Sequence, residues 1–128
     1  MEQERLIDKQ KGVLVAISGG ADSVVLLHYL VSNGYYCIAA HCNFHLRGEE
    51  SDRDEQFVRQ FCDELSVPLH VAHFETKQYA ESHKLSIEMA ARELRYGWFF
   101  KIMEQEQLPC VAVAHHSDDA VETFLLNL

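Results

Sequence analysis

A glycine-containing turn between an apolar run and a helix-like segment constrains this chain more than any other feature. Val13–Ile17 is short, apolar and rich in β-branched residues, which is typical of a strand buried on both faces. The turn Ser18-Gly19-Gly20-Ala21-Asp22-Ser23 follows at once, and Ser23–Val31 has the apolar spacing of a helix. Glycines permit positive φ, and successive N–H groups at a helix start attract an anion. We therefore predict a phosphate-binding loop at Ser18–Ser23, with a plain strand–helix turn as the alternative.

The predicted loop differs from two common phosphate-binding motifs. It lacks the Gly-Lys-Ser/Thr of a Walker A loop and the Gly-x-Gly-x-x-Gly of a dinucleotide-binding turn. No lysine lies within Ser18–Ser23. Charge on bound phosphates must then be balanced by backbone N–H groups, the helix dipole, Mg²⁺ and arginines from other segments.

Strand-like and helix-like segments alternate along the rest of the chain. Further strands are predicted at Tyr36–His41, Leu69–Phe74 and Cys110–Ala114. This alternation predicts an α/β domain with a doubly wound parallel sheet between two layers of helices, a Rossmann-like three-layer arrangement. One further helix is expected from Ser51, and another from Asp118 or Asp119 through Val121, Phe124 and Leu125. A long helix is expected between them, capped by Ser86, with an apolar stripe at Ile87, Ala90, Ala91, Leu94, Trp98 and Ile102.

Length and composition indicate one ordinary domain. The chain has 128 residues, 48% of them hydrophobic, which suffices for one core. No run of eighteen apolar residues is present, and the acidic N-terminus differs from a signal peptide, so we expect a cytoplasmic protein without a membrane span. The four cysteines are widely spaced and are expected to be reduced thiols. The last apolar segment reaches Leu128 without a closing residue, so we expect residues 1–128 to be one domain that continues into others.

The turn and three later stretches resemble known proteins. Ser-Gly-Gly-x-Asp-Ser after a first strand is similar to the signature of the PP-loop ATP pyrophosphatases. The stretches His41–Asp52, Ala91–Tyr96 and His115–Phe124 resemble, in order and spacing, those of the tRNA(Ile)-lysidine synthetase family. Phe44 and His45 replace that family's usual His-Gly, and Ala120 stands where Gln is common.

The resemblance implies ATP and Mg²⁺ as cofactors and assigns the site residues. By it, the pyrophosphate side of ATP binds at Ser18, Gly19, Gly20, Ala21, Asp22 and Ser23. Asp118 and Asp119 follow the fourth predicted strand and so lie at the same sheet edge. Either aspartate is expected to hold or deprotonate an incoming amine, and Asp22 and Asp119 are the candidate Mg²⁺ ligands.

Two further side chains are candidates for catalysis. His116 has the chemistry of a general base or an orienting donor. Arg92 and Arg95 lie three residues apart on one predicted helix, and we favour Arg92 as the phosphate clamp because it matches the family motif. Arg95 is as consistent with a surface ion pair as with a ligand contact.

The implied function is a ligase that attaches L-lysine to the wobble cytidine of tRNA(Ile). The net charge of −9 argues against a broad tRNA surface on this domain, so we expect that surface outside residues 1–128. A homodimer is left open. The alternatives are another PP-loop tRNA-modifying enzyme of the thiolase type, a non-catalytic adenine-nucleotide sensor, and a metal phosphohydrolase using His115, His116, Asp118 and Asp119.

Overall fold

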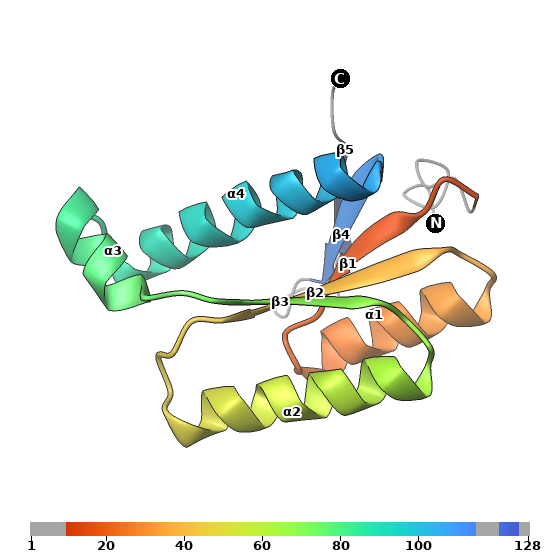
Figure 1. The fold of residues 1–128 in the computed structure, drawn as a ribbon, viewed down its shortest axis with the longest axis horizontal. Helices are drawn as coiled ribbons and strands as arrows, with labels where there is room; N and C mark the ends of the chain where they lie inside the picture. The colour runs from red at the N-terminus through yellow and green to blue at the C-terminus, as the bar shows by residue number, and fades with distance from the viewer. Residues whose placement is uncertain (1–9, 115–120, 126–128) are drawn as a thin grey trace.

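The computed structural model describes residues 10–114 and the backbone of residues 121–125. Strands and helices alternate along the chain, and the helices lie on both sides of one sheet (Figure 1). The strands are β1 (Val13–Ala16), β2 (Cys37–Asn43), β3 (Leu69–His73), β4 (Cys110–Ala114) and β5 (Val121–Leu125). The helices are α1 (Ala21–Ser32), α2 (Glu49–Glu64), α3 (Thr76–His83) and α4 (Ile87–Glu106).

The sheet has the order β3-β2-β1-β4-β5. Its first four strands run parallel, which confirms the predicted α/β class. The chain moves outward from β1 to β2 and β3 and then returns to the other side of β1 at β4. The sheet order therefore reverses at β1, and ligands of open α/β sheets bind outside the carboxyl ends of strands at such a point.

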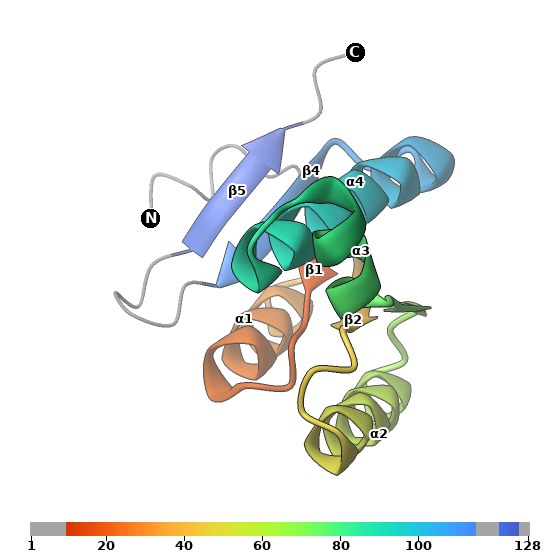
Figure 2. The same cartoon turned by 90° about the vertical axis from the view of Figure 1, so that its left-hand side faces the viewer.

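Side chains of the central strand alternate between two cores. Val13 and Val15 pack with buried residues of α1 and α2, whereas Leu14 and Ala16 pack with buried residues of α4. Figure 2 shows α4 on one side of the sheet, with α1 and α2 on the other. Because both faces of β1 are covered, its run of apolar residues is continuous rather than alternating with polar ones.

The long helix α4 begins as predicted but packs through other residues. Ser86 caps it, since the Ser86 side chain accepts a hydrogen bond from the N–H of Met89 at 3.1 Å. Ile87, expected on the buried stripe, is exposed. The buried positions of α4 are Ala90, Phe99, Ile102 and Met103. Most of them belong to its second half, so the predicted stripe was partly wrong.

The predicted last helix is wrong. Val121–Leu125 forms β5, which pairs antiparallel with β4 from Ala114↔Val121 to Cys110↔Leu125. Val, Thr and Phe suit a strand, and this pairing occupies the edge of β4 that would otherwise expose unpaired peptide groups. The short helix α3 was not predicted. Within the described part of the chain, no helix has the length and apolar character that crossing a membrane requires.

Candidate functional site

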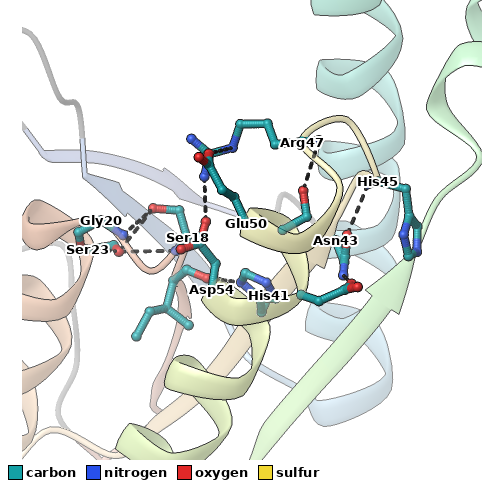
Figure 3. Close-up of polar contacts among 12 residues, drawn as sticks. Ser18, Gly20, Ser23, His41, Asn43, His45, Arg47, Glu50 and Asp54 are labelled. Carbon is teal, nitrogen blue, oxygen red and sulfur yellow. Dashed lines mark hydrogen bonds and ion pairs between the residues drawn. The ribbon is translucent and has the colours of Figure 1, made fainter.

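The predicted phosphate loop is a closely hydrogen-bonded turn at the carboxyl end of β1. The Ser23 hydroxyl accepts from the Ser18 N–H at 3.1 Å and donates to the Gly20 carbonyl at 3.0 Å. The Ser18 hydroxyl in turn accepts from the Gly20 N–H at 3.2 Å and lies 3.2 Å from the Ser23 hydroxyl (Figure 3). Among the residues described, no side chain caps α1, whose N-cap is Gly20. Gly20 has no side chain that could compete with an anion for the first N–H groups of α1.

Gly19 is the position where the turn requires glycine. Its φ is +97°, in the region that side chains rarely adopt. A Cβ on Gly19 would also lie 3.3 Å from the Cβ of Asp54 in α2. The turn and the first half of α2 therefore lie close together because Gly19 has no side chain.

A cavity of about 360 Å³ opens above this turn. It is lined by the loop together with residues of α2, of the β2–α2 loop and of the end of β4. Arg47 from the β2–α2 loop is one of these residues, and its guanidinium lies 2.5 Å from Asp54 and 3.9 Å from Glu50. Figure 3 shows Arg47 reaching from its own loop toward Ser18 and Asp54. The full lining is Ser18, Gly19, Gly20, Asp22, Ser23, Arg47, Asp54 and Ala114.

Sequence reasoning did not assign Arg47 a role. The available signal was its position, because the segments that follow the parallel strands β1 and β2 begin at the same edge of the sheet.

An adjoining cavity of about 150 Å³ contains Arg95. It shares Ser18, Ser23 and Ala114 with the first cavity, and its other walls are mostly apolar. The Nε of Arg95 is buried and has no hydrogen-bond partner among the described residues. A buried guanidinium nitrogen without an acceptor is costly, so an anionic ligand in this space would satisfy it.

Arg92, the arginine favoured from the sequence, lies elsewhere. It lines a different cavity with Met89, Glu93, Tyr96 and Phe100. The guanidinium carbons of Arg92 and Arg95 each lie 5.0 Å from the Tyr96 ring centroid. Arg95 lies one helical turn before Phe99, which is buried against the sheet, and this explains why Arg95 is the arginine that the structure brings to the loop.

Two buried polar residues organise the end of β2. His41 is 3% exposed, and its Nδ1 lies 2.7 Å from the carbonyl oxygen of Ile17, so Nδ1 carries the proton and donates. Its Nε2 has no partner among the residues described. Asn43 is 1% exposed and donates to Asp52 and Glu55 of α2, both at 3.1 Å. These contacts tie the strand ends beside the cavity to α2.

Glu55 is the centre of a polar network. Burial raises its pKa, but the hydrogen bonds from Asn43 and Arg59, the neighbouring His73 imidazole and the charge of Arg59 outweigh burial and lower the pKa below its ordinary value of 4.5. His73 Nε2 lies 2.9 Å from one Glu55 oxygen, and Arg59 Nε lies 3.0 Å from the other. Glu55 is therefore an ionised acceptor at neutral pH.

The four cysteines are free thiols, as the sequence predicted; Cys37, Cys62 and Cys110 are buried and Cys42 is partly buried. Burial, with Arg95 opposing it, raises the pKa of Cys42 to about 12, and this is the cysteine that lines the second cavity. Burial and the neighbouring Cys110 raise the pKa of Cys37 to about 12. Burial raises the pKa of Cys62 and Cys110 to about 11. Thiols so rarely ionised at neutral pH are poor nucleophiles.

Three predicted site residues lie outside the described residues: His116, Asp118 and Asp119. They follow Ala114 in the chain, and Ala114 lines both cavities. Asp22, by contrast, is described and lines the first cavity.

The sequence matches the PP-loop domain family over residues 1–128. The chain belongs to that family. Membership implies that this PP-loop domain uses ATP.

Close relatives of this PP-loop domain are known. A tRNA(Ile)-lysidine synthase of Bacteroides thetaiotaomicron and one of Parabacteroides distasonis are each 59% identical over 128 residues, 100% of the chain. A protein of the same name in Chlorobaculum tepidum is 44% identical over 132 residues. These relatives confirm the resemblance drawn from the motif stretches. The chain spans 30%, 29% and 40% of their respective lengths.

A solved structure shares the fold. The NH3-dependent NAD synthetase of Campylobacter jejuni, in complex with nitrate, superposes with a TM-score of 0.66 at 14% identity. The match covers 86% of this chain and 49% of that protein. At this identity the likeness concerns the fold alone.

Proposed function

We propose that this chain is the ATP-handling domain of a tRNA(Ile)-lysidine synthase. In this proposal ATP adenylates the C2 oxygen of the wobble cytidine of tRNA(Ile), and pyrophosphate leaves. The amine of L-lysine then attacks C2, a carbon–nitrogen bond forms, the bond to the AMP-bearing oxygen breaks, and the amine loses a proton. The relatives of that name, which match the whole chain at 59% identity, support this reaction over other PP-loop chemistry.

The observation that carries the proposal is the meeting of two arginines at a lysine-free phosphate loop. Arg47 and Arg95 come from opposite sides of the sheet to adjoining cavities that share Ser18 and Ser23. Negative charge grows on a departing pyrophosphate, and cationic donors that are already in place stabilise it. Arg95, whose Nε has no described partner, is assigned as the principal phosphate clamp in place of Arg92.

Mg²⁺ is the second element of the proposal. Asp22 and Asp54 both line the larger cavity, and carboxylate oxygens are the ligands that Mg²⁺ prefers. Mg²⁺ at nucleotide sites commonly uses one or two carboxylates together with phosphate oxygens, so Asp22 suits this role, with Asp119 as its proposed partner. When bound, the cation neutralises charge on the phosphates.

The remaining roles follow from the proposed reaction. His116 and Asp118 or Asp119 are proposed to orient or deprotonate the lysine amine. The net charge of −9 supports a main tRNA-binding surface outside residues 1–128, and a tRNA substrate supports a cytoplasmic location. The raised pKa of Cys42 disfavours a thiolase, which would need a reactive thiol at the site.

The test is pyrophosphate release by the full-length protein. We expect release that requires both tRNA(Ile) and L-lysine for turnover, and we expect Asp22→Ala to abolish most of it. Asp63→Ala, which removes an exposed carboxylate of α2, is the matched control and should keep normal turnover. Normal AMP formation by Asp22→Ala would overturn the proposal, and nucleotide binding without any turnover would favour a sensor.

A further inference from the structure

The loop that carries Arg47 contains a strained residue that is not glycine. His45 follows β2 and has a φ of +54°. A residue with a Cβ adopts this left-handed conformation only when other contacts compensate for the crowding. Leu46 and Arg47 come directly after it, so the conformation of His45 sets the direction in which the chain approaches the phosphate loop.

Asn43 of β2 and His73 of β3 contact His45 in this conformation, and Glu55 of α2 in turn contacts His73. The His45 N–H donates to Asn43 Oδ1 at 3.0 Å, which fixes the start of the loop. Its imidazole Nε2 lies 2.7 Å from Nδ1 of His73, at the end of β3, and the two ring centroids are 4.8 Å apart. His73 in turn lies 2.9 Å from Glu55 through its other nitrogen.

The Glu55 carboxylate determines the direction of these hydrogen bonds. An ionised carboxylate accepts only, so His73 Nε2 must carry a proton. In a neutral His73 ring, Nδ1 is then the acceptor, and His45 Nε2–H is the donor. Hydrogen bonds in this chain of contacts are therefore donated in one direction, from His45 in the loop to His73 of β3 and from His73 to Glu55 of α2.

The loop beyond His45 leads to the phosphate cavity through two further contacts. The Arg47 N–H donates to the Ser51 hydroxyl at 3.2 Å, and the Arg47 guanidinium pairs with Asp54. Both partners belong to α2, as Glu55 does. A loop fixed at His45 and again at Arg47 presents the guanidinium to the cavity that contains Ser18 and Gly19.

We infer that His73 and Glu55 are positioning residues, which fix the left-handed turn at His45 and thereby place Arg47 beside the phosphates of ATP. This inference rests on the proposed binding of ATP by the loop. It assigns a role to His73 and His45, neither of which lines either cavity.

A double-mutant cycle on the full-length protein tests the inference, with the dissociation constant of ATP measured by calorimetry. His73→Ala removes the support of His45, and we expect ATP binding to weaken about fivefold to tenfold. His45→Gly makes the left-handed turn intrinsically accessible, and we expect ATP binding within about twofold of the wild type. In the His45→Gly background, His73→Ala should change ATP binding by less than about twofold, a rescue that shows the coupling.

The controls separate this inference from a general loss of stability and from the proposed function. Arg47→Met should weaken ATP binding equally in the wild-type and His45→Gly backgrounds, since it removes the positioned group itself. Thermal unfolding of each variant reports whether His73→Ala merely destabilises the fold. Equal weakening of ATP binding by His73→Ala in both backgrounds would overturn the positioning role. Absence of ATP binding by the wild-type protein would instead overturn the proposed function.

Discussion

The two halves of the proposed phosphate site are built in different ways. The turn Ser18–Ser23 is held by hydrogen bonds between residues at most five positions apart. The arginine rim, which we define as Arg47 and Arg95 with the residues that hold them, combines contacts within the segment from Arg47 to Asp54 with contacts between segments far apart in the chain. His45 and His73, for example, are 28 residues apart. A substitution in the turn should therefore weaken ATP binding strongly. Substitutions in the rim should weaken ATP binding by smaller amounts, and they should do so even at residues that lie outside the cavities.

The largest effect is expected from Gly19→Ala. The new Cβ would occupy a φ of +97° and would lie 3.3 Å from Asp54, so both the turn and its contact with α2 must shift. We expect ATP-dependent turnover to fall about 100-fold, with calorimetry showing lost ATP binding.

Gly34→Ala is the matched control for Gly19→Ala. Gly34 also has a positive φ, +84°, but a Cβ there meets no described atom within 4 Å. Its substitution should lower stability by about 1 kcal/mol and leave ATP binding unchanged. Comparable losses of ATP binding in the two variants would contradict a special role for the turn.

The next largest effect is expected from Arg95→Met, on the rim. Methionine keeps much of the apolar stem of Arg95 but removes the guanidinium from the second cavity. We expect the KM for ATP to rise about tenfold, and Arg92→Met to change it less than about twofold. Steady-state kinetics on both variants would decide which arginine is the phosphate clamp. A larger effect of Arg92→Met would assign that role to Arg92, the arginine favoured from the sequence.

The turn could be predicted from the sequence, whereas the arginine rim could not, and the same structural difference explains why. The turn was readable because its glycines, serines and helix start are consecutive, and one strand–turn–helix unit defines their geometry. The four parallel strands were readable for a similar reason, since apolar runs and punctuation by Pro68 and Pro109 are local signals. Local signals also located the Ser86 cap.

The rim was not predictable from local patterns. Favouring Arg95 over Arg92 required knowing that α4 contacts the sheet through Phe99 and Met103 in its second half, and the apolar residues of α4 are too many to single out that half. The role of His73 depends on the pairing of β2 with β3, which no short motif encodes. The strand β5 was mistaken for a helix because a short run of mostly apolar or β-branched residues fits either element, and only the open edge of β4 decides between them.

A smaller effect on the rim is expected from Glu55→Gln. Glutamine keeps the shape and one oxygen acceptor but loses the charge that Asn43, Arg59 and His73 stabilise. We expect a loss of about 1 kcal/mol in the free energy of unfolding at neutral pH, measured by urea denaturation.

The pH dependence of Glu55→Gln tests the cause. Since the folded state lowers the pKa of Glu55 below 4.5, the carboxylate stabilises the fold above that pH and ceases to do so as the pH falls through the folded pKa. The difference in stability between wild type and Glu55→Gln should therefore shrink in acid. A difference that stays constant across that range would show that charge is not the reason.

The smallest effect is expected from Thr76→Val, which tests how far support for the rim extends. Thr76, the first residue of α3, is 1% exposed, and its hydroxyl donates to the carbonyl of Phe44 at 2.9 Å across 32 positions. Valine has the same shape without the hydroxyl, so we expect a loss of about 0.5 kcal/mol of stability and a weakening of ATP binding of about twofold. Thr76→Ser removes only a methyl group and keeps the hydroxyl donor, so this variant should bind ATP as the wild type does. If Thr76→Val left ATP binding unchanged, the residues that support the rim would include those of β3 but not those of α3. A weakening that serine reverses would extend that support to α3, because Phe44 lies directly before the strained residue His45.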